Sequence, residues 1–153
     1  LILRQQPVAS DLRQVSTALK VVTDLERIGD HASDIAELIL RIKSEHAYHI
    51  VKHLPVMAAS ANAMVHDAIE AFINQDLDSA MEIIERDDEV DTLFNQVKDD
   101  VIHLLKSSPD QADQGIDLLM VAKYLERIGD HAVNVCEWTQ FSKTGALKNV
   151  RIM

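Results

Sequence analysis

The sequence predicts an all-α fold built from long helices. Hydrophobic residues make up 47% of the 153 residues but aromatic ones only 4%, and the chain has four glycines and three prolines. An aliphatic composition with so few helix-breaking residues is typical of helical bundles. Apolar residues also recur three and four positions apart, which places them on one face of a helix. We therefore expect antiparallel helices joined by short connections.

One octapeptide occurs twice in the chain. Leu-Glu-Arg-Ile-Gly-Asp-His-Ala occupies residues 25–32 and again residues 125–132, each within a helical pattern. At about 100° per residue, the Glu and Asp of each copy lie along one flank of the apolar stripe, whereas the His lies on the far side. A generic solvent-exposed edge would be free to differ between the copies, so the repetition favours a role for the carboxylates.

Each octapeptide places a glycine in the middle of a helix. Gly29 and Gly129 each cost about 1 kcal/mol relative to alanine. Two explanations remain open, namely close approach by a neighbouring helix and room beside the carboxylates for a ligand.

The first helix is expected from about Ser10 to Ile42, because Pro7 should end any earlier element and Ser10 can cap the new one. Its apolar stripe comprises Leu25, Ile28, Ala32, Ile35, Ala36 and Ile39. This stripe needs a pair of partner helices, which the equivalence of the two copies places before residue 1. Upstream sequence is expected, since the chain starts at Leu1 without an initiator methionine.

Residues 44–54 are expected to form a junction or the kinked start of the second helix. Histidines three and four positions apart could form a metal site there, although solvated histidines are common in such segments. These are His46, His49 and His53.

Three further helices are expected at about 56–73, 76–107 and 110–141. Asp76 can cap the second of these, and Gly145 follows the end of the last one. Their connections are short enough for residues 46 to 141 to close a three-helix antiparallel bundle.

Two acids of the third helix can meet two of the fourth. In an antiparallel pair, Asp87 and Asp91 would face Glu126 and Asp130 across the seam. Crowded carboxylates repel and raise one another's pKa unless a cation lies among them. Such oxygen ligands suit iron, manganese, magnesium or calcium. The alternative is that these acids are solvated edges, which pair with arginines for under about 1 kcal/mol.

Several other functions are disfavoured by composition and motifs. A formal net charge of -10 argues against direct nucleic-acid binding. Neither octapeptide has the Glu-x-x-His that a buried di-iron site requires, and the chain has no phosphate loop, zinc-protease motif or nucleophile elbow. No apolar run approaches the ~18 residues of a membrane helix. Cys136 is the only cysteine, so we expect a small buried residue in a reducing cytoplasm.

These motifs together resemble the PhoU family of phosphate-signalling proteins, over nearly the whole chain. The first part of the match is carried by Gln5, Gln6, Pro7, Asp11, Leu12, Arg13, Leu19, Lys20 and residues 24–30. The second part is carried by residues 86–91 and by the second octapeptide.

The resemblance implies a fold of tandem three-helix bundles. Residues 1–45 would be the third helix of the first bundle, residues 46–145 the complete second bundle, and residues 146–153 a C-terminal tail. About two helices would then be lacking at the front.

The resemblance also implies multinuclear surface clusters of iron or zinc, bound by Glu/Asp-x-x-x-Asp motifs on two helices of each bundle. In the second bundle the ligands would be Asp87, Asp91, Glu126 and Asp130. In the first bundle only Glu26 and Asp30 would be present, with Asp34 as a possible extra ligand.

By resemblance, the protein would be a cytoplasmic and often dimeric adaptor that negatively regulates the phosphate-starvation response and phosphate uptake. It would link the ATPase of the phosphate ABC transporter to a sensor histidine kinase, without enzymatic activity. The residues alone leave two alternatives open. One is a metal-dependent hydrolase that uses a metal-activated water, and the other is a purely structural helical scaffold.

Overall fold

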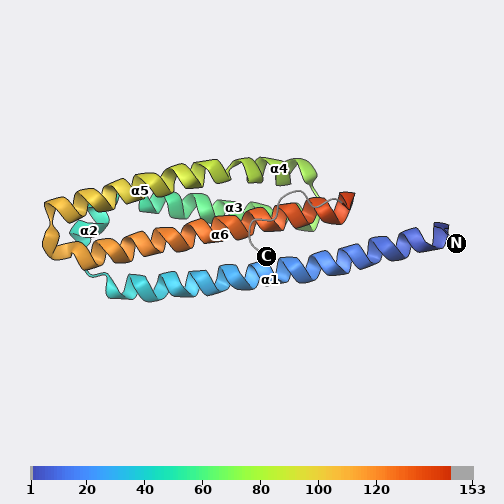
Figure 1. The fold of residues 1–153 in the computed structure, drawn as a ribbon, viewed down its shortest axis with the longest axis horizontal. Coiled ribbons are helices and arrows are strands. Elements are labelled where there is room, and N and C mark those ends of the chain that lie inside the picture. Colours follow the sequence, from blue (N-terminus) through green and yellow to red (C-terminus); the bar gives the residue numbers. More distant parts are fainter. Residues whose placement is uncertain (1, 146–153) are drawn as a thin grey trace.

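The computed structural model describes the backbone of residues 2–145 and the side chains of residues 8–145, and within this range every regular element is a helix (Figure 1). The all-α prediction is therefore confirmed. The elements are α1 (Ile2–Arg41), α2 (Glu45–Ile50), α3 (Leu54–Asn74), α4 (Leu77–Glu85), α5 (Asp87–Ser107), the 3-10 helix η1 (Pro109–Gln111) and α6 (Ala112–Thr144).

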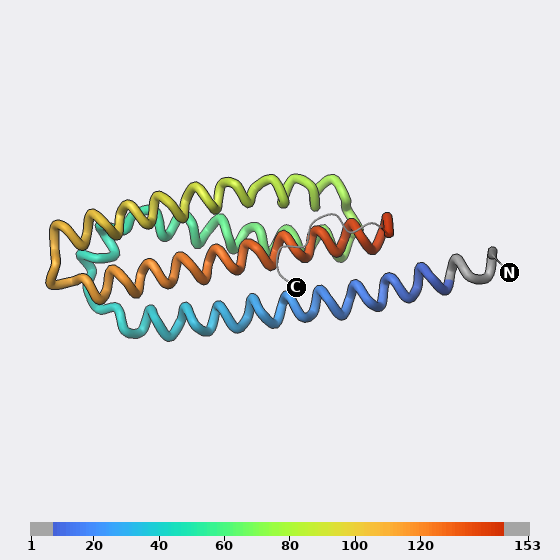
Figure 2. The backbone as a smooth tube through the Cα atoms, in the orientation of Figure 1, coloured from blue at the N-terminus to red at the C-terminus, as the bar shows by residue number. Residues whose placement is uncertain are grey.

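The helices form an elongated antiparallel bundle. Helix α3, the rod made of α4 and α5, and α6 pack against one another, and α1 runs antiparallel to α6 along one side of this group (Figures 1 and 2). Helix α1 packs mainly on α6, so α6 is the helix that contacts both α1 and the other three helices.

The predicted helix boundaries are largely confirmed. The Asp76 carboxylate accepts a hydrogen bond from the Ser79 N–H at 3.2 Å and so caps α4. Gly145 ends α6 in the left-handed region with φ 75°. Gln75 ends α3 in the same region, and Ser44 caps the short helix α2 that fills the predicted junction.

Two boundaries differ from the prediction. Helix α1 begins at Ile2 and includes Pro7, so this proline does not end an element. A proline inside a helix removes one backbone hydrogen bond, and the rest of this 40-residue helix outweighs that loss. The predicted third helix is divided at Arg86 into α4 and α5.

The apolar stripe of α1 packs on α6, so a partner for it lies within this chain, whereas we expected its partner pair before residue 1. Buried Val21, Leu38 and Ile42 form the centre of the contact. The residues of the predicted stripe are less buried than these three, which shows that the face of α1 that contacts α6 is rotated from the predicted face. Leu25, Ile28 and Ile35 are half-buried, and Ala32, Ala36 and Ile39 are exposed.

Helix α6 is enclosed on nearly all sides in its second half. Every residue from 131 to 139 is buried there, polar ones included. A helix that is apolar on all sides is a buried helix, and α1 provides the cover on the side away from α3 and α5. Across the part of the chain that the structure describes, no helix combines the length and apolar character needed to cross a bilayer.

Candidate functional site

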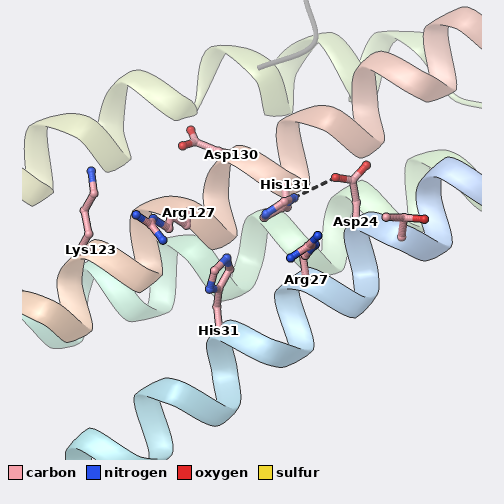
Figure 3. A pocket seen from close by; sticks show the side chains of 8 residues that line it. Asp24, Arg27, His31, Lys123, Arg127, Asp130 and His131 are labelled. Carbon is pink, nitrogen blue, oxygen red and sulfur yellow. Dashed lines mark hydrogen bonds and ion pairs between the residues drawn. The ribbon is translucent and has the colours of Figure 1, made fainter. Parts of the chain in front are cut away.

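The two octapeptides meet in space because α1 and α6 are antiparallel. Between them lies a groove of about 450 Å³, which is within the range of small-molecule sites. Figure 3 shows Arg27 and His31 extending from α1 toward α6, where Arg127 and His131 lie. The groove is lined by Thr23, Asp24, Arg27, His31, Lys123, Arg127, Asp130 and His131.

A buried polar pair anchors one wall of the groove. His131 Nδ1 donates a hydrogen bond to Asp24 Oδ1 at 2.8 Å, and Asn134 Nδ2 lies 3.4 Å from the same oxygen. His131 and Asp24 are only 3% and 5% exposed. A buried carboxylate must be hydrogen-bonded to be tolerated, so this contact fixes how α1 lies on α6.

His31 has no equivalent partner. Its ring stacks at 5.6 Å on both Tyr124 and His131. Its Nδ1 atom is buried and makes no hydrogen bond within the described part of the chain. Burial lowers the pKa of His31, and the neighbouring His131 and Arg127 lower it further.

The two arginines of the octapeptides are free of acidic partners. Arg27 and Arg127 are exposed, and neither makes a salt bridge or a side-chain hydrogen bond with another residue in the 8–145 range. Lys123 differs, since its Nζ donates to Glu126 Oε1 at 2.7 Å. The groove therefore has two guanidinium groups available to a ligand.

The start of α5 faces the second octapeptide, as the metal-site prediction requires. A Cβ added at Gly129 would lie 3.6 Å from Val90 Cγ1 and 3.9 Å from Asp87 Oδ1. Asp87 is only 1% exposed. Its carboxylate thus lies against α6, beside the segment that carries Glu126 and Asp130. Carboxylate oxygens are the donors that hard divalent cations prefer.

The remaining predicted ligands of this cluster are half-buried. Asp91 follows Asp87 by one turn of α5, and Glu126 and Asp130 lie on α6. Asp130 points away from α1 (Figure 3). The Lys123 ammonium already neutralises Glu126, so a cation would compete with it.

The first-bundle ligands are placed differently. Glu26 and Asp30 are exposed on α1. Asp34 lines a hollow of about 260 Å³ between α1 and α6, together with Arg41 and Tyr124. Asp34 therefore differs from Glu26 and Asp30 in being half-buried, although it follows Asp30 by one turn of α1.

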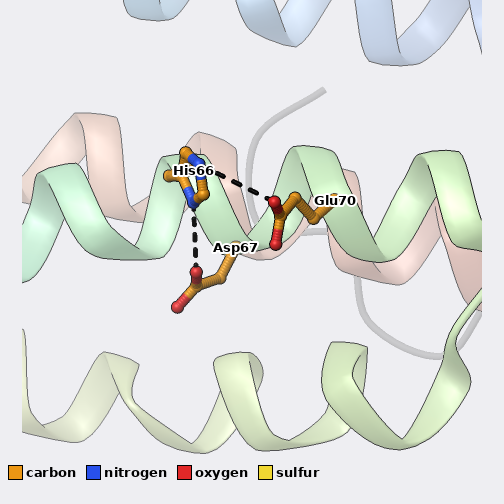
Figure 4. A group of neighbouring side chains, drawn as sticks. All are labelled: His66, Asp67 and Glu70. Carbon is orange, nitrogen blue, oxygen red and sulfur yellow. Dashed lines mark hydrogen bonds and ion pairs between the residues drawn. The ribbon is translucent and has the colours of Figure 1, made fainter.

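One other group of potential ligands was not expected from the sequence. His66, Asp67 and Glu70 on α3 are the one group in the described chain whose donor atoms all lie within 4.8 Å of one another (Figure 4). His66 Nδ1 lies 3.3 Å from Asp67, and Nε2 lies 3.8 Å from Glu70. The Arg86 guanidinium donates to Asp67 at 2.7 Å, and it and His66 lower the pKa of that carboxyl. The Arg86 guanidinium therefore already balances the negative charge of Asp67, and a metal ion at this group would compete with it.

The junction histidines do not converge on one site. His46 Nε2 is 3.1 Å from the Ser108 hydroxyl, whereas His53 Nδ1 is 2.7 Å from Asp100 Oδ2. Each ring thus ties the junction to a different part of the bundle.

The sequence did not single out the buried pair of Asp24 and His131. On the wheel of the fourth helix His131 lies opposite the carboxylates, where solvent is the usual neighbour. The available signal was that residues 132–138 are apolar on several faces, which indicates a helix covered on more than one side.

Comparison with known proteins gives a family match over most of the chain. The model of the PhoU domain matches residues 1–39 and 54–139. A curated relative from Clostridium acetobutylicum, named as a phosphate-specific transport system accessory protein PhoU homolog, is 43% identical over 95% of this chain and 67% of its own. A Thermotoga maritima protein of similar name is 34% identical over 99% of this chain and 65% of its own. The chain thus spans about two thirds of these relatives.

Solved structures agree with the sequence match. The phosphate transport system regulatory protein PhoU from Streptococcus pneumoniae superposes with a TM-score of 0.80 at 30% identity, covering 92% of this chain and 66% of the other. PhoU from Pseudomonas aeruginosa gives 0.81 at 32% identity, covering 95% and 70%.

Proposed function

This chain belongs to the PhoU family, and from that membership we propose that it is a non-enzymatic regulatory adaptor of phosphate uptake. In this role it acts in the cytoplasm as a negative regulator of the phosphate-starvation response. It links the ATPase of a phosphate ABC transporter to a sensor histidine kinase, and it works as a homodimer. The observation that carries the proposal is the family match across both octapeptide-bearing helices.

The direct test is a pull-down of the full-length protein with the transporter ATPase and with the sensor domain of the kinase. We expect both to be retained, and the absence of both contacts would refute the adaptor role. Deletion of the gene should leave phosphate-uptake genes expressed in high phosphate. Unchanged repression after deletion would contradict negative regulation.

We also propose that carboxylates on α5 and α6 hold metal ions, with iron or zinc as the first candidates. The ligands in this proposal are Asp87, Asp91, Glu126 and Asp130, and the position of Asp87 beside Gly129 supports it. A metal there would neutralise acids that otherwise repel one another. Glu26, Asp30 and Asp34 are the proposed ligands of the first bundle.

Elemental analysis of the purified protein tests the metal proposal. Glu126→Ala and Asp130→Ala should each lower the bound metal several-fold. The matched control is Asp99→Ala, which removes an exposed acid of α5 outside the cluster. Equal metal content in all variants would favour solvated acids instead. Loss of metal with unchanged partner binding would show that the metal only stiffens the bundle.

A further inference from the structure

The metal proposal accounts for the acids of the octapeptides but leaves their basic residues without a role. Arg27 and Arg127 come from corresponding positions of the two copies, and the antiparallel helices bring both to one groove. We propose that this groove binds a tetrahedral oxyanion, namely a phosphate group, between the two guanidinium groups. This inference does not depend on the adaptor role, because it rests on the groove alone.

The charges around the groove support an anionic ligand. Like charges placed together repel, and an anion bound between two guanidinium groups relieves that repulsion. Of the two acids that line the groove, Asp24 already accepts the hydrogen bond from His131, and the carboxyl of Asp130 points away from α1 (Figure 3). Among residues 8–145, neither acid forms a salt bridge with Arg27 or Arg127, so both guanidinium groups keep their N–H donors for a ligand.

The donors have the geometry that oxyanions need. A guanidinium presents a planar fork of N–H groups that binds phosphate oxygens in pairs. Lys123 also lines the groove, but its ammonium is paired with Glu126 and lies over the Phe94 ring of α5, so the two arginines are the cations that face α1 and α6 together. The buried Nδ1 of His31 has no partner within residues 8–145, and it can donate to an oxygen in the tautomer that carries its proton there.

The volume also fits. A groove of about 450 Å³ holds a small anion together with bridging water, and water-mediated contacts are nearly as favourable as direct ones. The phosphate group could also belong to a phosphorylated side chain or metabolite, with the rest of that ligand extending out of the groove into solvent.

The test is isothermal titration of inorganic phosphate into the protein at constant ionic strength, since exposed charges are screened by salt. We expect saturable binding that Arg27→Gln and Arg127→Gln each weaken at least tenfold. Arg27→Lys keeps the charge but loses the fork, so its loss should be smaller. Both arginines are exposed, and circular dichroism would verify that the variants stay folded.

Arg41→Gln is the matched control. Arg41 is an exposed arginine of α1 outside the groove, so this variant loses the same charge and should bind phosphate as before. Equal weakening by Arg41→Gln, unchanged affinity in both groove variants, or no saturable binding by the unaltered protein would each overturn the proposal. A parallel titration with phosphoserine separates the sources. Tighter binding of phosphate assigns the groove to the free ion, and tighter binding of phosphoserine assigns it to a phosphorylated ligand.

Discussion

The two octapeptides have the same residues and the same helical conformation but different surroundings. A methyl group added at Gly29 would meet no neighbouring atom within 4 Å, whereas one added at Gly129 would face Val90 and Asp87 of α5. Ala32 is exposed, and its counterpart Ala132 is fully buried. Identical local sequence therefore does not determine burial. The number of helices that pack around each copy does.

The comparison also changes how the glycines are explained. A Cβ added at Gly29 would have no atom of another helix in the described chain within 4 Å, and at Gly129 the nearest contact, 3.6 Å, is ordinary van der Waals distance. Alanine would fit at both positions, so helix packing within residues 8–145 does not require glycine. The remaining explanation from the sequence is space beside the carboxylates for a ligand.

The largest difference between the two copies is expected in how much stability the protein loses when the histidine of each copy is replaced by alanine. His131→Ala would leave the Asp24 carboxylate buried without its partner, which costs about 3–5 kcal/mol of the free energy of unfolding. His31→Ala removes only stacking contacts and should cost about 1 kcal/mol. Urea unfolding of both variants measures the difference. Similar losses would mean that the buried pair does not hold α1 on α6.

The second largest difference is expected in the reactivity of a cysteine thiol at position 136 and at the corresponding position 36. Burial, followed by the charge of Glu137, raises the pKa of Cys136 from 9.0 to about 12. At about pH 8 its thiolate is then roughly a thousandfold scarcer than that of an exposed cysteine. The counterpart position is Ala36, which is exposed.

The experiment compares the native chain with Ala36→Cys in a Cys136→Ala background. A thiol-specific reagent should modify the cysteine at position 36 about a thousandfold faster than Cys136 in the native chain. Comparable rates would show that the second copy is as accessible as the first.

A leucine in place of each glycine should change the stability of the protein in opposite directions. Gly129→Leu forces extra atoms against Val90 and Asp87 and should destabilise the protein by about 1–3 kcal/mol. Gly29→Leu meets open space and should stabilise α1 by up to about 1 kcal/mol. Thermal denaturation monitored by circular dichroism decides this, and destabilisation by both substitutions would remove the contrast.

The smallest effect is expected from alanine at the same positions. Gly29→Ala and Gly129→Ala should each add up to about 1 kcal/mol to the free energy of unfolding, because helical glycine is entropically costly. Metal analysis and phosphate titration of the same variants would then show whether either ligand needs that space. A stabilised Gly129→Ala variant with unchanged binding of both would leave the glycine unexplained.

Much of the fold could be predicted from local chemistry. The Asp76 cap, the end of α6 at Gly145 and the break before Pro109 depend on residues next to one another in the chain, and all three are as expected. The prediction at Pro7 was wrong, because a helix of 40 residues can continue through a single missing hydrogen bond. Cys136 was expected to be buried and is.

The site was only partly predictable. The sequence indicated that Asp87 would face the second octapeptide, and the structure places it there. It offered no reason to pair Asp24 with His131, which are 107 positions apart. Their contact depends on α1 covering the outer side of α6, and a helical wheel contains no information about which neighbour covers which side.

By itself, the sequence determined that the chain is helical, where most helices begin and end, and that one octapeptide is used twice. These features follow from periodicity, capping and repetition, which act over a few residues. Only the tertiary structure decided that the two copies lie antiparallel against each other, that their arginines line one groove and that the second copy is the more buried. Those outcomes depend on contacts between distant segments, whose free energy is set by the surfaces that meet.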